Sequence, residues 1–324
     1  MKRENRLAFT VMALTAAVAT YVSVAAVFIK TLADAATSKQ MPSVLKPVSQ
    51  KIKGEIVSRE FVHTVIDTAA KLKLEDTQTV SIKSRDGLTL IGHWYGAKNP
   101  KRILIAMHGW RSGWALDFGL PVEFYHNNGC SVLFPDQRSQ GESEGEHICF
   151  GVMERYDCVD WLYYIINRFG TDLPIYLCGV SMGATTVLMS SSLGLPDTVH
   201  GIISDCAFTS PNAIWHHVFK NNLKLNTQFL YHIAKMYITK RAGFGDDVST
   251  VDSVEKTKIP ILFIHGENDS FVPVDMTYQN FNACASKKHL LIVKNAEHGM
   301  SYFTNPNDYE KNVLSFFELY DNCD

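Results

Sequence analysis

The sequence lacks the patterns by which most metal and nucleotide sites are recognised. Its seven cysteines form no CxxC pair, and their odd number and irregular spacing predict no disulfide framework. It has no HExxH motif and no glycine-rich phosphate loop. We therefore expect neither a bound metal nor a nucleotide cofactor.

Charge of one sign is not in excess either. The chain has 31 basic and 33 acidic side chains and a formal net charge of −2. Nucleic-acid-binding proteins concentrate basic residues on one face, so this balance argues against a nucleic-acid partner. With 324 residues, 46% of them hydrophobic, the chain can bury a large core without disulfides.

The first thirty residues differ in composition from the rest. Lys2, Arg3 and Arg6 precede an uncharged run from Leu7 to Ile29. As a helix this run could cross a hydrocarbon core of about 30 Å, and it exceeds the roughly 7 to 15 apolar residues of a signal peptide. We predict a single-pass anchor in the cell membrane and, from the N-terminal cations, an extracytoplasmic location for the rest. The alternatives are a signal peptide cleaved near Ala33-Asp34-Ala35 and a buried helix.

In domain terms, this anchor covers residues 1–30, and residues 31–75 are expected to connect it to the rest of the chain. Pro42 and Pro47 lie among Ser, Thr and Lys residues, as in a loop. The stretch from Glu55 to Leu74 has an apolar stripe at helical spacing. We predict a covering helix there, followed by one domain over residues 76–324.

Within that domain, short apolar runs alternate with helical stretches. An alternating strand, Thr79–Lys83, turns at Asp86-Gly87 into a returning strand, Leu88–Tyr95. Later runs are continuously apolar, as in strands buried on both faces of a parallel sheet. They are residues 103–107, 131–134, 175–178, 201–204, 261–264 and 290–293. Strands alternating with helices predict an α/β fold with an eight-stranded, mostly parallel sheet and helices on both faces.

One insertion, residues 211–247, interrupts this alternation. It places aromatic and aliphatic side chains at helical spacing, among them Trp215, Phe229 and Ile233. An insertion after the carboxyl end of a strand lies over the crevice where α/β sheets bind ligands. We interpret it as a lid in which these three residues contact substrate. The alternative is a helical hairpin packed at the periphery.

The strongest chemical signal is Gly179-Val180-Ser181-Met182-Gly183. It joins an apolar strand to a helix, which is the context that a G-x-S-x-G nucleophile elbow requires. Glycines flank the serine because side chains there would clash across a cramped turn. The helix N-terminus favours developing negative charge. Ser181 is therefore the predicted nucleophile.

A serine hydroxyl needs a base to take its proton. His298 follows the last predicted strand, and the chain order in such sheets is serine, acid, histidine. His108 precedes the serine, while His216, His217 and His232 lie in the predicted lid. These positions favour His298 as the base.

The acid that orients this histidine should follow the next-to-last strand. Asp269 is the best candidate there, because a buried carboxylate fixes the imidazole tautomer and stabilises its cation. Asp205, after the preceding strand, and Glu267, on the turn itself, are alternatives. Asp136 precedes the nucleophile, and we expect it to form a loop-ordering salt bridge with Arg138.

A serine nucleophile also needs an oxyanion hole. One donor should be the backbone N–H of Met182, directly after the serine. The other should come from the loop after the strand 103–107, which makes the N–H of Trp110 the natural partner. The Trp110 side chain would then wall the substrate pocket; its alternative role is core packing.

Together these motifs resemble the bacterial membrane-anchored α/β-hydrolases grouped as serine aminopeptidase-like and lysophospholipase-like proteins. The resemblance runs from about Val80 to Phe317. It rests on residues 108–110, 136–143, 179–183, 265–273 and 297–299. One departure is Gln137-Arg138-Ser139-Gln140-Gly141, where relatives usually have Arg-Gly-His-Gly or similar.

The resemblance implies esterase, lipase or peptidase chemistry without choosing among them. We expect cleavage of a small-molecule ester or thioester through an acyl-enzyme intermediate, with no cofactor. The alternatives are a peptidase acting on short peptides, an acyltransferase, and a catalytically idle binding protein on the same fold.

Overall fold

A single eight-stranded sheet organises the chain. The computed structural model describes residues 20, 23–39, 58–224, 228–243, 245 and 248–321. The strand order is β1-β2-β4-β3-β5-β6-β7-β8. The strands are β1 (Gln78–Lys83), β2 (Thr89–Tyr95), β3 (Arg102–Met107), β4 (Cys130–Pro135), β5 (Ile175–Val180), β6 (Val199–Asp205), β7 (Ile261–Gly266) and β8 (Lys288–Val293).

The strand directions confirm the predicted α/β class. Strand β2 pairs antiparallel with both β1 and β4, and all further pairings, from β4 through β8, are parallel. Each strand coincides with one of the predicted apolar or alternating runs. Gly87, with φ +90°, lies at the predicted turn between β1 and β2.

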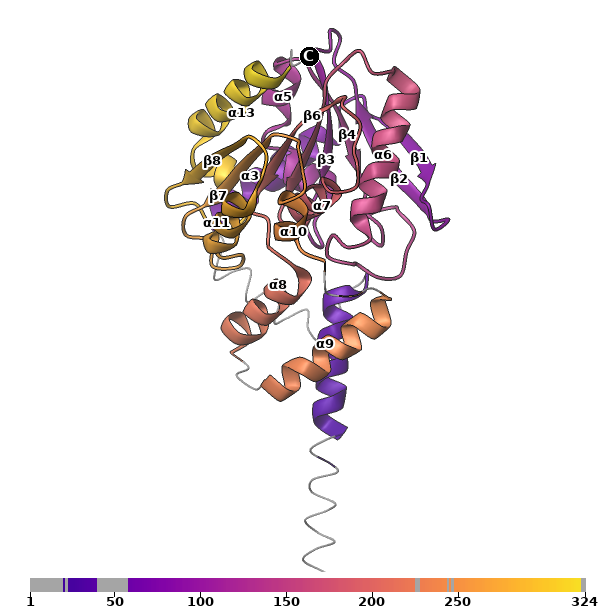
Figure 1. Ribbon diagram of the computed structural model, residues 1–324, viewed down its shortest axis with the longest axis vertical. Coiled ribbons are helices and arrows are strands. Elements are labelled where there is room, and N and C mark those ends of the chain that lie inside the picture. Colours follow the sequence, from indigo (N-terminus) through magenta and orange to yellow (C-terminus); the bar gives the residue numbers. More distant parts are fainter. Residues whose placement is uncertain are drawn as a thin grey trace, which may run out of the picture.

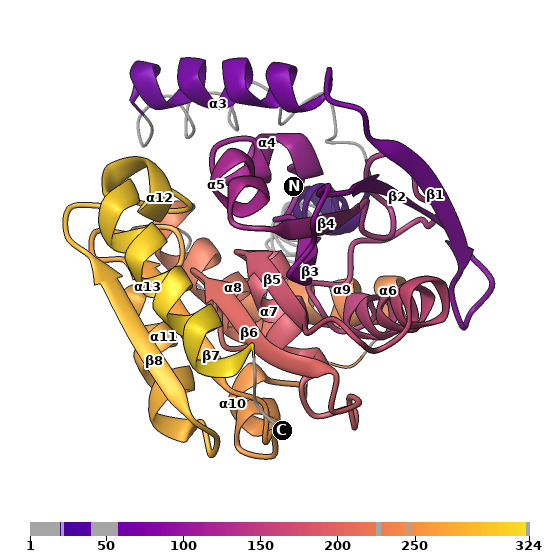
Figure 2. The same ribbon diagram turned by 90° about the horizontal axis from the view of Figure 1, so that it is seen from above.

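Helices cover both faces of the sheet, because successive side chains of each buried strand point to opposite faces. In β3, Leu104 and Ala106 join one apolar cluster, whereas Ile103, Ile105 and Met107 join the other. The first face is covered by α3 (Arg59–Leu72), α4 (Trp114–Phe118), α5 (Val122–Asn127) and α13 (Pro306–Tyr320) (Figure 2). The second is covered by α6 (Glu154–Phe169), α7 (Met182–Ser190), α10 (Thr250–Val254) and α11 (Val274–Ala283).

A third apolar cluster lies at one end of the sheet. It joins the predicted insertion, which forms α8 (Pro211–His217), a π-helical turn (Val218–Asn222) and α9 (Gln228–Ala242), to a helix of residues 23–37. Figure 1 shows α8, α9 and this indigo helix gathered below the sheet. The cluster also contains Met182, the residue after the predicted nucleophile. We call α8, α9 and the helix of residues 23–37 together the cover.

The predicted membrane anchor must be corrected. Most of the run from Leu7 to Ile29 lies outside the described residues, and no helix among those described is long and apolar enough to cross a membrane. Ile29, the last residue of the run, and Ala33 beyond it are 3% and 1% exposed, whereas Val24, Val27 and Phe28 within the run are 64%, 65% and 43% exposed. The predicted single-pass location in the cell membrane is therefore wrong. Apolar length alone gave no sign that the end of this run packs against its own domain. The predicted loop around Pro42 and Pro47 lies outside the described residues.

The close approach of α7 to β3 leaves no room for a side chain at Gly183. A Cβ there would lie 1.9 Å from the carbonyl oxygen of Met107, far inside van der Waals contact. Gly183→Ala should lower the free energy of unfolding by about 3 kcal/mol, the upper end of ordinary overpacking costs, because backbone must move. Urea denaturation followed by circular dichroism measures the change.

Gly113→Ala is the matched control. Gly113 has an extended φ of −165°, and a Cβ there meets nothing within 4 Å. Its stability should stay close to that of the unsubstituted protein. Equal unfolding midpoints for the two variants would contradict the packing argument.

Candidate active site

Ser181 stands at a strained turn between β5 and α7. Its backbone has φ 55° and ψ −116°, a conformation that non-glycine residues rarely adopt. The turn brings Gly179 so close to Gly183 that a Cβ on Gly179 would lie 2.3 Å from the Gly183 carbonyl carbon. The two glycines of the motif are thus required by a backbone crossing. The serine lies at the N-terminus of α7.

The structure brings Ser181, His298 and Asp269 together in one hydrogen-bonded chain. His298 Nε2 lies 2.9 Å from Ser181 Oγ, and His298 Nδ1 lies 2.7 Å from Asp269 Oδ2. Ser181 follows the carboxyl end of β5, Asp269 that of β7 and His298 that of β8. These distances suit proton transfer from the hydroxyl to an imidazole held by a carboxylate.

Charge and burial act in opposition on this pair. Burial favours a protonated Asp269, but the adjacent His298 and the hydrogen bond from His265 outweigh it and hold the pKa of that carboxyl well below its usual range. Burial likewise favours a neutral His298, but the Asp269 carboxylate outweighs it and raises the pKa of the imidazole well above its usual value. Asp269 is therefore ionised at neutral pH and stabilises a protonated His298.

A second histidine holds the same carboxylate. His265 Nε2 lies 3.1 Å from Asp269 Oδ2 and 2.9 Å from the carbonyl oxygen of Val272. Both partners are acceptors, so Nε2 carries the proton, and Nδ1 accepts from the Thr277 hydroxyl at 2.7 Å. The other Asp269 oxygen accepts the backbone N–H groups of Phe271 and Val272. In the sequence His265 stands out only as part of a motif, because a residue inside a buried strand gives no sign of its side-chain partner.

Neither alternative acid is hydrogen-bonded to His298. Asp205 Oδ1 accepts the Ser301 hydroxyl at 3.0 Å, and burial raises the pKa of its carboxyl to about 6. Glu267 is exposed on the turn. Asp205 thus lies next to the loop that carries His298, since Ser301 begins α12 (Ser301–Thr304) just beyond that histidine.

The predicted salt bridge between Asp136 and Arg138 is wrong. Arg138 pairs instead with Asp157 and Asp86, at 2.6 and 2.9 Å. Asp136 accepts the backbone N–H of Glu142 at 2.8 Å. Asp136 and Arg138 are only two positions apart, but the chain turns between them, so their side chains point to different partners.

The loop after β3 passes directly beside the nucleophile. A Cβ on Gly109 would lie 3.4 Å from the Cβ of Ser181, and the Gly109 N–H donates to Asp117 Oδ2 at 2.6 Å. Trp110 is the next residue of this loop. Met182 is the first residue of α7, whose N-terminal N–H groups have no acceptor within the helix. Both predicted oxyanion donors therefore belong to segments that adjoin Ser181.

The predicted substrate-contacting residues divide into two groups. Trp215 is buried in the cover cluster, where its ring meets Phe150 edge-on at 5.2 Å, and Trp110 stacks on the same Phe150 at 6.5 Å. Ile233 is partly buried. Phe229 is 74% exposed and lies outside the cluster, so its predicted contact with substrate is not supported by its position. A helical stripe in sequence did not reveal which side of α9 faces inward.

Cys206 adds a thiol that the sequence analysis did not connect to the site. Potential ligand atoms of Cys206, Asp269 and His298 lie within 4.8 Å of one another. Metal binding needs a thiolate, but burial raises the pKa of the Cys206 thiol to about 11. Asp269 already occupies His298 Nδ1. The trio therefore fits an acid–base pair with a neighbouring neutral thiol better than a metal centre.

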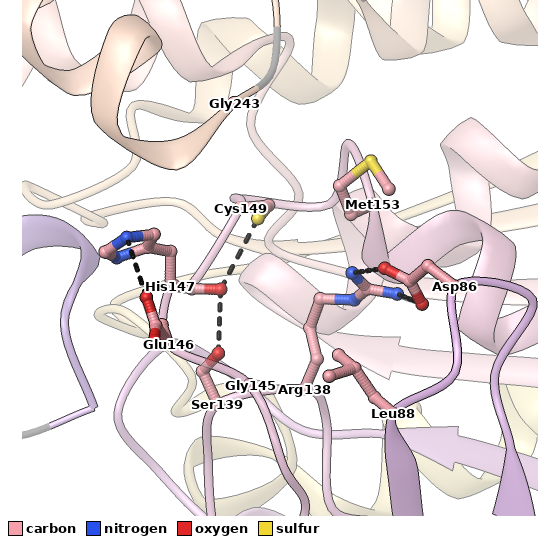
Figure 3. Close-up of a pocket in the computed structure, with 10 residues that line it drawn as sticks. All are labelled: Asp86, Leu88, Arg138, Ser139, Gly145, Glu146, His147, Cys149, Met153 and Gly243. Carbon is pink, nitrogen blue, oxygen red and sulfur yellow. Dashed lines mark hydrogen bonds and ion pairs between the residues drawn. The ribbon is translucent and has the colours of Figure 1, made fainter.

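A separate cavity of about 200 Å³ lies away from these residues. Figure 3 shows it between the β1–β2 hairpin, the loop after β4 and the end of α9. Its lining includes Arg138, whose guanidinium is paired with Asp86 and Asp157, and His147. None of Ser181, Asp269 and His298 lines it.

Comparison with known proteins agrees with the fold. Residues 102–234 match a family described by the α/β hydrolase fold. An uncharacterized Bacillus subtilis protein, YqkD, is 27% identical over 274 residues, which cover 84% of this chain and 88% of that protein.

Two solved structures show the same architecture. The esterase Pf2001 of Pyrococcus furiosus is 22% identical with a TM-score of 0.63, over 78% of this chain and 96% of that one. An acylaminoacyl peptidase of Pyrococcus horikoshii is 16% identical with a TM-score of 0.54, over 78% of this chain and 43% of that one. At these identities the likeness shows the fold.

The coupling between Asp269 and His298 predicts how the imidazole titrates. In the unsubstituted protein His298 should have a pKa above the ordinary histidine value of about 6.5, because deprotonation removes an ion pair. Asp269→Asn should lower that pKa, whereas Asp205→Asn should change it less. NMR titration of the histidine rings measures both. His289, whose pKa burial lowers, is an internal reference. A His298 that titrates below His289 would contradict the assignment.

Proposed function

Because this chain has the α/β-hydrolase fold, we propose that it is a serine hydrolase that cleaves carboxylic esters or thioesters through an acyl-enzyme intermediate. The observation that carries the proposal is the hydrogen-bonded chain from Ser181 through His298 to Asp269, at 2.9 and 2.7 Å. The strained backbone of Ser181 supports it further, since strain at a functional turn persists only where surrounding structure maintains it.

In the proposed reaction, Ser181 Oγ attacks the ester carbonyl while His298 Nε2 takes the hydroxyl proton. Asp269 stabilises the resulting imidazolium, and the N–H groups of Met182 and Trp110 stabilise the oxyanion. His298 then gives its proton to the leaving alcohol or thiol, and the carbonyl re-forms as an acyl-enzyme. A water molecule, deprotonated by His298, then attacks the acyl carbon, and His298 returns that proton to Ser181 Oγ as the acid leaves.

The surroundings of the candidate nucleophile favour an acyl chain as the bound group. Met182 belongs to a cluster of apolar and aromatic side chains that also contains Phe150, Phe208 and Trp215. Such a lining suits an uncharged acyl chain better than a charged peptide terminus. The match to the Pyrococcus furiosus esterase spans nearly all of that protein, whereas the match to the peptidase spans less than half. Cleavage of short peptides and acyl transfer to an alcohol are the competing activities.

Covalent labelling tests the proposal. A fluorophosphonate should label the full-length protein, and Ser181→Ala should abolish the label while the circular dichroism spectrum stays unchanged. Ser191→Ala is the control, because Ser191 is a buried serine whose hydroxyl bonds only to the carbonyl of Leu188 within its own helix turn. Labelling of folded Ser181→Ala at the unsubstituted rate would sink the assignment.

Substrate panels separate the competing activities. p-Nitrophenyl esters should be hydrolysed with higher kcat/KM than aminoacyl anilides. Faster cleavage of the anilides would favour a peptidase, and faster acyl transfer to an added alcohol than to water would favour a transferase.

The cover predicts how activity depends on acyl length. Burying a methylene is worth about 0.8 kcal/mol, so each added methylene should raise kcat/KM by up to about fourfold until the apolar site is full. Trp215→Ala should flatten this dependence but leave acetyl ester turnover nearly unchanged. Phe229→Ala should leave the whole profile unchanged, because that ring is exposed. The measurement is kcat/KM for esters from acetyl to dodecanoyl. A profile that is flat before any substitution would show that the cover does not line the acyl site.

A further inference from the structure

The helix of residues 23–37 ends against the loop that carries Trp110. The indole Nε1–H of Trp110 donates to the carbonyl oxygen of Ala36 at 2.8 Å. The neighbouring Arg111 donates from its guanidinium to the carbonyls of Ala35, at 2.8 Å, and Ser38. The loop after β3 is thus held by the last turn of a helix distant in sequence.

The chemistry of this contact is that of a helix C-terminus. The last carbonyls of a helix lack N–H partners within it and form the negative end of its dipole, so a guanidinium there is favourable. The guanidinium of Arg111 donates through both terminal nitrogens, Nη2 to the carbonyls of Ala35 and Ser38 and Nη1 to that of Lys39 at 3.4 Å, which the single nitrogen of a lysine ammonium does less well. The C-terminal turn is also firmly seated, because Thr37 is fully buried and its carbonyl accepts the Ile148 N–H at 2.6 Å.

Arg111 is held from both sides. Its backbone has φ +50°, the left-handed region that non-glycine residues seldom occupy. Its N–H donates to Gln140 Oε1 at 2.7 Å, while its guanidinium lies over the Trp110 ring, 5.2 Å from the centroid. A strained residue with its backbone tied to one loop and its side chain to a helix end leaves the adjacent peptide group little freedom.

We propose that Arg111 is a positioning residue: by binding the carbonyls that end the helix of residues 23–37, it holds the backbone N–H of Trp110 where an oxyanion forms. This inference rests on the proposed serine hydrolase function and deepens it. The helix of residues 23–37 then contributes to the active site through the Trp110 loop. Docking of this helix then affects how well the oxyanion of the transition state is stabilised. A contact that served only overall stability would leave that stabilisation unchanged.

The test compares Arg111→Ala with Lys39→Ala in the full-length chain. The Lys39 side chain ties the same segment to the carbonyl of Ser143, at 3.1 Å, and only its backbone carbonyl, which alanine retains, accepts from Arg111. Arg111→Ala should lower kcat by about 10- to 100-fold, less than or similar to deletion of one oxyanion donor, with KM changed little. Lys39→Ala should keep kcat within about twofold of the unsubstituted protein.

A transition-state analogue separates positioning from general damage. The inhibition constant of a trifluoromethyl ketone, which forms a tetrahedral oxyanion on the serine, should rise in Arg111→Ala in parallel with the loss of kcat/KM. Trp110→Phe, which removes only the indole donor to Ala36, gives a second variant should Arg111→Ala not fold. Like Arg111→Ala, it should lower kcat and raise the inhibition constant.

The outcomes are distinct. Unchanged kcat in folded Arg111→Ala, or in Trp110→Phe if the former does not fold, would overturn the inference while the proposed function stands. Equal losses in Arg111→Ala and Lys39→Ala would also overturn it, because docking alone would then explain the effect. A full-length protein that neither reacts with a fluorophosphonate nor hydrolyses esters would overturn the proposed function and the inference with it.

Discussion

The crossing of backbone at Gly179 and Gly183 is the constraint on which the candidate site depends. Without a Cβ, Gly179 lets β5 turn tightly into α7, since an added carbon would lie 2.3 Å from the Gly183 carbonyl carbon, and Gly183 lets α7 approach β3, since its Cβ would lie 1.9 Å from the Met107 carbonyl oxygen. That turn places Ser181 at the carboxyl edge of the sheet and at the N-terminus of a helix. The other candidate groups reach it from the carboxyl ends of β3, β7 and β8 or from the cover.

Around this turn, one carboxylate organises the acid–base chemistry. Asp269 receives hydrogen bonds from His298 and His265 on one oxygen and from two backbone N–H groups on the other. A buried charge is tolerated only when it is paired and fully hydrogen-bonded, which is the case here. The same contacts hold the pKa of Asp269 low and that of His298 high, so the pair behaves as one electrostatic unit.

The cover connects fold and specificity. The cover shares one apolar cluster with Met182 and Trp110. The cover and the two residues that carry the proposed oxyanion donors are therefore packed together. In this arrangement a segment more than seventy residues from the Trp110 loop in sequence contributes carbonyl groups that hold it. Local sequence around the nucleophile contains no trace of that dependence.

The sequence by itself determined the eight strands, the elbow at Ser181 and the position of His298, because apolar periodicity and turn glycines are local signals. Tertiary structure decided that Asp269, not Asp205, lies beside His298, since β7 and β8 are neighbours and Asp205 is engaged by Ser301. It also decided that Phe229 faces outward and that Ile29 and Ala33 pack on protein. An apolar run records only that a side chain avoids water; whether lipid or protein covers it depends on the chain's three-dimensional arrangement.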